Sequence, residues 1–149
     1  MHRRQGLRLL AASSAATFLL TACGSSEVSV TKAEKAANPL CAKVAQHWPQ
    51  KVAGQEQRDV STSGGTEAAW GDPAIIARCG VTSPGADEHC VDANGVDWVY
   101  SELSDGAGFV TFGREPAIQV LVPSDYAGDA IGAFAAAAKQ IPQGNRKCS

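Results

Sequence analysis

The sequence predicts an α+β domain of two layers, in which an antiparallel β-meander of about four to five strands packs against an N-terminal and a C-terminal helix. Three observations predict this class. Tight-turn sequences such as Asn94-Gly95 divide the middle of the chain into short apolar runs, as in antiparallel hairpins. Amphipathic helical patterns stand before and after these runs. Four cysteines remain when Cys23 is set aside, and an even number predicts two disulfides in an exported domain.

Residues 1–22 are expected to be a signal peptide. Arg3, Arg4 and Arg8 precede the uncharged apolar run Leu9 to Leu20. As a helix this run measures about 18 Å, less than the ~30 Å hydrocarbon core of a bilayer, so a cleaved signal is favoured over a permanent span. The run ends in Leu20-Thr21-Ala22-Cys23, which resembles the bacterial lipobox. Small residues there admit the signal peptidase, and the cysteine thiol receives a diacylglycerol.

We therefore expect a lipid on Cys23, which would anchor the protein at the extracytoplasmic face of the cell membrane. Residues 23–37 are rich in Ser, Thr, Lys and Glu and are expected to form a flexible tether. Two alternatives stay open. Cys23 can belong to an ordinary secretory signal, and Arg3-Arg4-Gln5-Gly6-Leu7 is similar to a twin-arginine export signal.

The folded domain is expected over residues 38–149. Asn38-Pro39 is a helix start, since Asn caps free amides and Pro lacks a donor. An apolar stripe at steps of four follows until Pro49, and residues 54–65 are polar and loop-like. Extended runs are expected next, at Ala68 to Trp70, Ala74 to Cys79, His89 to Ala93, Val96 to Leu103, Phe109 to Phe112 and Ala117 to Val122.

A final helix is expected to open at Pro123-Ser124-Asp125 and to end at Pro142 and Gly144. Apolar residues at helical spacing mark the face that it would bury. These residues are Ala127, Ala130, Ile131, Phe134, Ala138 and Ile141.

Five short motifs occur in a fixed order along the predicted domain: Asn38-Pro39-Leu40-Cys41, Trp70-Gly71-Asp72-Pro73, Arg78-Cys79-Gly80-Val81, Asn94-Gly95-Val96-Asp97-Trp98 and Phe112-Gly113-Arg114. In this order and spacing the chain resembles the domain of unknown function 3515 (DUF3515) family of small actinobacterial cell-envelope lipoproteins. The resemblance covers essentially the whole mature domain. It implies a location in the cell envelope, and it supplies no activity, substrate or catalytic residue.

The charge distribution argues against nucleic-acid binding. All 15 carboxylate side chains lie at Glu27 or beyond, whereas Arg3, Arg4 and Arg8 belong to the expected signal peptide. The mature domain is therefore acidic and has no basic stripe to follow a phosphate backbone. The expected partners are the membrane, through the lipid on Cys23, and an unknown envelope protein or small anionic ligand.

The four remaining cysteines allow three pairings, of which we expect Cys79–Cys90 and Cys41–Cys148. The first would close a local loop, and the second would tie the first helix to the chain end. A metal site from Cys79, His89 and Cys90 is the alternative. Zinc sites usually contain a close Cys-x-x-Cys pair, which is absent, so no metal is expected.

Asp72, Arg78, Trp98 and Arg114 are the best candidates for a ligand site. They would form an anionic-ligand pocket if they converge, with the arginines as clamps, although structural roles are the favoured interpretation. The nucleophile, phosphate-loop and metalloprotease motifs are missing, so no catalytic residue and no cofactor is expected. We expect a non-catalytic binding or interaction module. The alternative is a small envelope hydrolase with an unrecognised active site.

Overall fold

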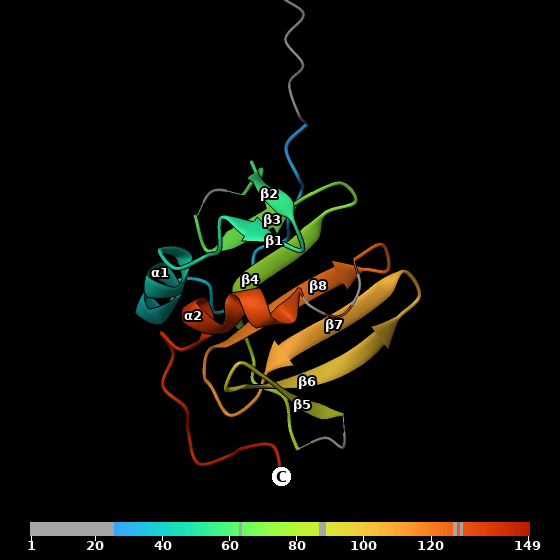
Figure 1. Cartoon of the computed structure of the whole chain (residues 1–149). Helices are drawn as coiled ribbons and strands as arrows, with labels where there is room; N and C mark the ends of the chain where they lie inside the picture. The colour runs from blue at the N-terminus through green and yellow to red at the C-terminus, as the bar shows by residue number, and fades with distance from the viewer. Residues whose placement is uncertain (1–25, 63, 87–88, 127, 129) are drawn as a thin grey trace, which may run out of the picture.

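An antiparallel sheet dominates the fold of the computed structural model, which describes residues 26–62, 64–86, 89–126, 128 and 130–149 (Figure 1). Within these residues the sheet has eight strands in the order β1-β2-β3-β4-β8-β7-β6-β5. The strands are β1 (Lys51–Val52), β2 (Gln55–Arg58), β3 (Glu67–Trp70), β4 (Ile75–Val81), β5 (Cys90–Ala93), β6 (Val96–Leu103), β7 (Gly106–Thr111) and β8 (Ala117–Pro123). The helices are α1 (Pro39–Ala45), the 3₁₀ turn η1 (Ile131–Phe134) and α2 (Ala135–Ala138).

The α+β class and the antiparallel sheet are confirmed, but the expected number of four to five strands is wrong. Two four-stranded meanders, β1–β4 and β5–β8, join where β8 pairs with β4. The β1–β2 hairpin was missed inside a polar stretch. Its turn uses Ala53 and Gly54 at positive φ (48° and 76°), and Val52 is its one buried residue, so no apolar alternation marks it.

The expected hairpin at Asn94-Gly95 is present between β5 and β6. Both residues have positive φ, 52° and 75°, as a two-residue type I′ turn requires. Strand β6 has the bounds that the apolar run indicated, and β7 and β8 differ from their runs by only a few residues.

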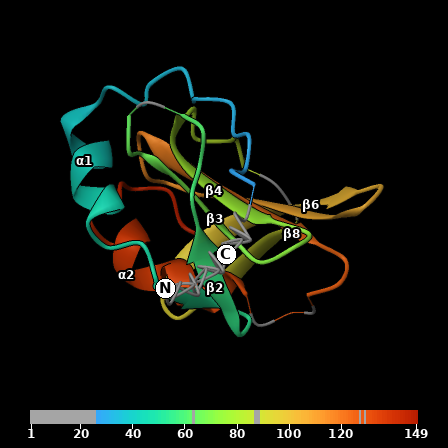
Figure 2. The same cartoon turned by 90° about the horizontal axis from the view of Figure 1, so that it is seen from above.

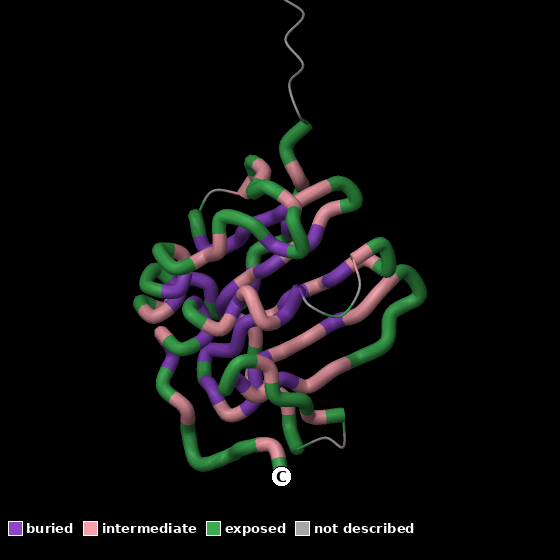
Figure 3. Tube along the Cα trace, viewed as in Figure 1, coloured by how far each residue is buried: buried purple, intermediate pink, exposed green. Residues whose placement is uncertain are grey.

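The core lies between one face of the sheet and the helices, where the buried segments of Figure 3 gather. Trp70 and Phe134 are fully buried and meet edge to face, with ring centroids 5.2 Å apart. Trp48 packs edge to face against both rings. Helix α1 begins as expected, because Asn38 Oδ1 accepts a hydrogen bond from the amide of Leu40 at 2.9 Å.

The C-terminal helix is shorter than expected. Strand β8 continues to Pro123, and helical structure begins only at Ile131. Gly128 has a positive φ of 42°, which an α-helix does not allow, so the helix cannot start before it. Of the expected buried face, Ala127 lies outside the described residues. None of the helices in the described part of the chain is long and apolar enough to cross a membrane.

Residues 26–37, here called the N-terminal strap, correct the expected tether. Val28 forms a parallel bridge with Val60, and its amide donates to Asp59 O at 2.9 Å. Val30 and Ala36 are buried. Figure 2 shows the strap and α2 on opposite sides of β3, β4 and β8. A flexible tether over 23–37 and a domain boundary at 38 are therefore wrong from Ser26 onward, because small apolar side chains among the polar ones pack against the sheet.

Two disulfides join the four cysteines of the described part, but the expected pairing is wrong. The bonds are Cys41–Cys79 and Cys90–Cys148, with Cα–Cα distances of 5.4 and 5.5 Å. The chain leaves β4 in the middle of the sheet and re-enters at the edge strand β5. Four strand spacings, roughly 19 Å, then separate Cys79 from Cys90, beyond the reach of a disulfide. The short sequence separation between Cys79 and Cys90 therefore does not mean that the two residues are close enough to pair.

Candidate functional site

The four predicted ligand residues do not form one site. Asp72 is exposed in the turn between β3 and β4. Arg78 points to the strap side of β4, where its Nε donates to Gln119 Oε1 at 2.7 Å and its Nη1 to Thr31 O at 3.0 Å. Trp98 is fully buried in the core on the opposite face of the sheet. The predicted anionic-ligand pocket is therefore not assembled.

Arg114 follows β7 and is buried, with 6% of its surface exposed. Its Nη1 donates to the carbonyl of Ile141, near the end of the C-terminal helical segment. Burial lowers the pKa of Arg114, and the charge of nearby Asp97 opposes this shift. The side chain secures the chain beyond α2 to the sheet, which is the structural interpretation of this residue.

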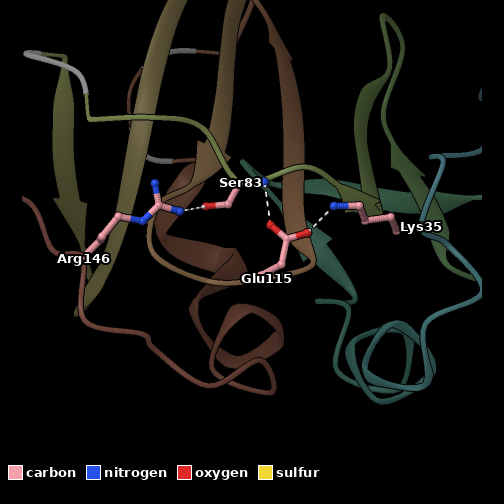
Figure 4. A network of polar contacts seen from close by, with 4 residues as sticks. All are labelled: Lys35, Ser83, Glu115 and Arg146. Atoms are coloured by element: carbon pink, nitrogen blue, oxygen red, sulfur yellow. Dashed lines mark hydrogen bonds and ion pairs between the residues drawn. The ribbon is translucent and has the colours of Figure 1, made fainter.

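Glu115, beside Arg114, joins the N-terminal strap to the loop after β4 (Figure 4). One carboxylate oxygen pairs with Lys35 Nζ of the strap at 2.6 Å. The other accepts from the amide of Ser83, in the loop after β4, at 2.9 Å. Arg146 of the C-terminal segment donates to Ser83 Oγ at 3.3 Å and stacks over Phe112. Sequence reasoning missed this network, because its members come from four separate segments without a shared motif.

The Lys35 hydrogen bond, followed by that of the Ser83 amide, holds the pKa of Glu115 below its ordinary value. A depressed pKa in the folded state stabilises the fold above the unfolded pKa, and this contribution is lost as the pH falls through the folded pKa. We expect Glu115→Gln to lower the free energy of unfolding at neutral pH by at most about 1 kcal/mol, because the side chain is half exposed.

The difference between Glu115→Gln and wild type should shrink to nothing at a pH well below the ordinary glutamate range. Urea unfolding of both proteins at neutral and acidic pH measures it. Glu102→Gln, at an exposed position of β6, is the matched control for loss of one charge. A difference that persists unchanged in acid would contradict the role of this carboxylate.

A small apolar pocket of about 170 Å³ lies beside the β7–β8 pair. The segment that leads into η1 forms its other wall, and Tyr126 is fixed there by a 2.8 Å hydrogen bond from its hydroxyl to Pro73 O. Its main apolar lining comes from Ala107, Phe109, Val122, Tyr126, Ala130 and Ile131. Neither Arg114 nor Glu115 lines it. This pocket is the best candidate for a binding site in the described structure.

Among the described residues, no group of three His, Cys, Asp or Glu side chains is placed to hold a metal ion. Cys23 and the expected signal peptide, residues 1–22, lie outside the described residues, so the lipid attachment stays a prediction.

The comparison with family models decides the relationship that the motifs suggested. The model of the protein of unknown function DUF3515 matches residues 7–145. The chain belongs to the DUF3515 family. No curated protein and no solved structure matches it. The matched range includes the strap and the residues that line the apolar pocket. It also includes every cysteine of the two disulfides except Cys148, which lies beyond residue 145. The family description names no activity.

Proposed function

We propose that this DUF3515 protein is a lipid-anchored, extracytoplasmic binding module, attached to the membrane through Cys23. One observation carries the proposal. Cys23 of the lipobox-like run Leu20-Thr21-Ala22-Cys23 stands three residues before Ser26, the first described residue, whose carbonyl already accepts a hydrogen bond from Arg58. The folded domain is held by two disulfides among its described cysteines, and such bonds persist outside the reducing cytosol.

The apolar pocket supports the binding part of the proposal. Its volume of about 170 Å³ is close to that of engineered apolar cavities that hold one benzene ring. The fitting ligand class is therefore a single apolar group, such as an aromatic or branched aliphatic moiety of a partner. Arg114 and Glu115, the groups with displaced pKa values, are both engaged in structural contacts away from this pocket. The geometry favours binding over acid–base chemistry.

Cys23→Ala is expected to leave a protein without the lipid, which is either unprocessed, with residues 1–22 still attached, or released to the soluble fraction. A single acyl chain gives an association constant of only about 10⁴ M⁻¹, so stable retention needs the diacylglycerol and any further chain on this cysteine. Detergent phase partitioning of cells that express each variant measures the change. Ser25→Ala, two residues away, is the matched control and should stay in the membrane fraction. Wild-type membrane retention of a Cys23→Ala protein that has lost residues 1–22 would contradict the anchor.

Ala107→Phe is expected to fill the pocket and to weaken the binding of benzene by at least about tenfold, since the ring would occupy the ligand's volume. Ligand-induced shifts in the NMR spectrum of the methyl groups measure binding. Ala107→Ser keeps the pocket open and serves as the control. Equal binding by wild type and Ala107→Phe, or no binding by wild type, would remove the pocket from the proposal.

A further inference from the structure

We infer that the domain stands on its own membrane by one edge of the sheet, with the lipid headgroups against the corner where the strap begins. This corner, here called the anchor corner, consists of Ser26, Glu27, the end of β2 at Arg58-Asp59 and the turn at Gly71-Asp72-Pro73. The inference rests on the proposed lipid attachment at Cys23 and adds the orientation of the domain to it.

The anchor corner is a rigid part of the fold. Arg58 donates from Nη2 to Ser26 O at 2.7 Å and from Nη1 to Gly71 O at 2.8 Å. One guanidinium thus joins the start of the strap to the β3–β4 turn. Two residues after Ser26, Val28 O accepts from the amide of Ser61 at 3.0 Å, and the amide of Val28 donates to Asp59 O at 2.9 Å. The first described residue is therefore fixed to the sheet.

The chain between the lipid and this corner is short. Three residue steps lead from Cys23 to Ser26 and span at most about 10 Å when fully extended. The headgroup layer on each side of a bilayer is itself roughly 5–8 Å thick. A tether that extended to residue 37 would have reached about 50 Å and would have left the orientation free. With packing from Ser26 onward, the anchor corner has to lie at the headgroup surface.

The order of the strands defines what lies far from the membrane. Six strand spacings separate β2 from β5, which is roughly 29 Å in a flat sheet and less in a twisted one. Figure 1 shows the same arrangement, with the start of the strap on the side of β2 and with β5 and the C-terminus at the opposite end. The β1–β2 edge therefore faces the bilayer, and the β5 edge points away from it.

Charge identifies the kind of lipid surface that fits. Glu27, Asp59 and Asp72 are exposed at the anchor corner, whereas Arg58 is half-buried and engaged by two carbonyl oxygens. In the proposed orientation these carboxylates would come within a Debye length of about 8 Å of the headgroups, so an anionic surface would repel them. The corner fits a zwitterionic headgroup surface, and the covalent lipid rather than charge attraction holds it there.

Energy transfer from two positions to the membrane tests this orientation. The full lipidated protein is bound to phosphatidylcholine vesicles that contain a headgroup-labelled acceptor lipid. A fluorescent amino acid replaces either Gln57, exposed on β2, or Val91, 40% exposed on β5. Transfer from position 57 should be strong and transfer from position 91 weak, which corresponds to heights above the bilayer that differ by up to roughly 29 Å.

A matched variant carries a flexible Gly/Ser insertion of about twelve residues between Ser25 and Ser26. It should stay bound to the vesicles but lose most of the difference between the two positions. Equal transfer from both positions in the vesicle-bound protein without the insertion would overturn the orientation and leave the anchor intact. A difference that survives the insertion would show that the short tether does not set the orientation. If the chain carries no lipid on Cys23, the proposed function fails and the orientation fails with it.

Discussion

Replacing both Cys41 and Cys79 by alanine is expected to lower the free energy of unfolding by on the order of 4 kcal/mol. The bond closes a loop with a sequence separation of 38 and so limits the conformations of the unfolded chain. Without the bond the unfolded chain gains conformational entropy, which favours unfolding. Both residues are fully buried, so lost packing adds to the effect. Since a domain of this size is stable by only about 5–15 kcal/mol, the variant should unfold at a much lower urea concentration.

A thiol count in the same variant tests the pairing independently of stability. With Cys41 bonded to Cys79, the double alanine variant keeps the Cys90–Cys148 bond and exposes no free thiol from these residues on denaturation. Under the pairing that the sequence suggested, Cys90 and Cys148 would both lose their partners. Two titratable thiols from these positions would therefore contradict the structure.

Gly80→Ala is expected to destabilise the protein by roughly 2–6 kcal/mol, because two costs combine at this position. Gly80 has a φ of 111°, which side chains rarely adopt. A Cβ there would also press against the backbone nitrogen of Ala36 and come within 2.7 Å of its Cα. The strap lies at this point against the irregular end of β4, where the amide of Lys35 donates to Gly80 O at 2.8 Å. A methyl group would push the strap off the sheet.

Gly85→Ala is the control for Gly80→Ala. Its Cβ would meet nothing within 4 Å, so the same chemical change should leave stability almost untouched. Urea unfolding measures both variants, and hydrogen exchange at the amide of Lys35 reports on the strap itself. Equal stability of the two variants would mean that the strap is not packed as the structure has it.

The parts of the fold that local chemistry determines could be predicted from the sequence. Asn38 capping α1 and Asn94-Gly95 closing a hairpin depend on residues next to one another in the chain. Strands β4, β6 and β8 could be predicted from their apolar runs, and their residues alternate in burial over much of their length. The number of strands was underestimated because β1 and β2 form a mostly polar hairpin in which only Val52 is buried, so no apolar pattern marks it.

The features that depend on long-range placement could not be predicted from the sequence. The pairing of Cys41 with Cys79 follows from where β4 lies in the sheet, and no spacing in the sequence encodes it. The same holds for Glu115, whose partners Lys35 and Ser83 are far away in the chain. The packing of the strap was not expected from the sequence, since three small apolar residues among polar ones, Val30, Ala33 and Ala36, give a weak signal. These three side chains are buried in the structure, where Gly80 lets the strap backbone approach the sheet.

The mass of the N-terminal peptide of the native protein, extracted from the membrane with detergent, tests the central claim most directly. The lipid-anchor proposal predicts that the mature chain begins at Cys23 and that this residue carries a diacylglycerol, with or without a further acyl chain. A mature N-terminus at another position, or an unmodified cysteine at position 23 in the membrane-bound protein, would contradict it.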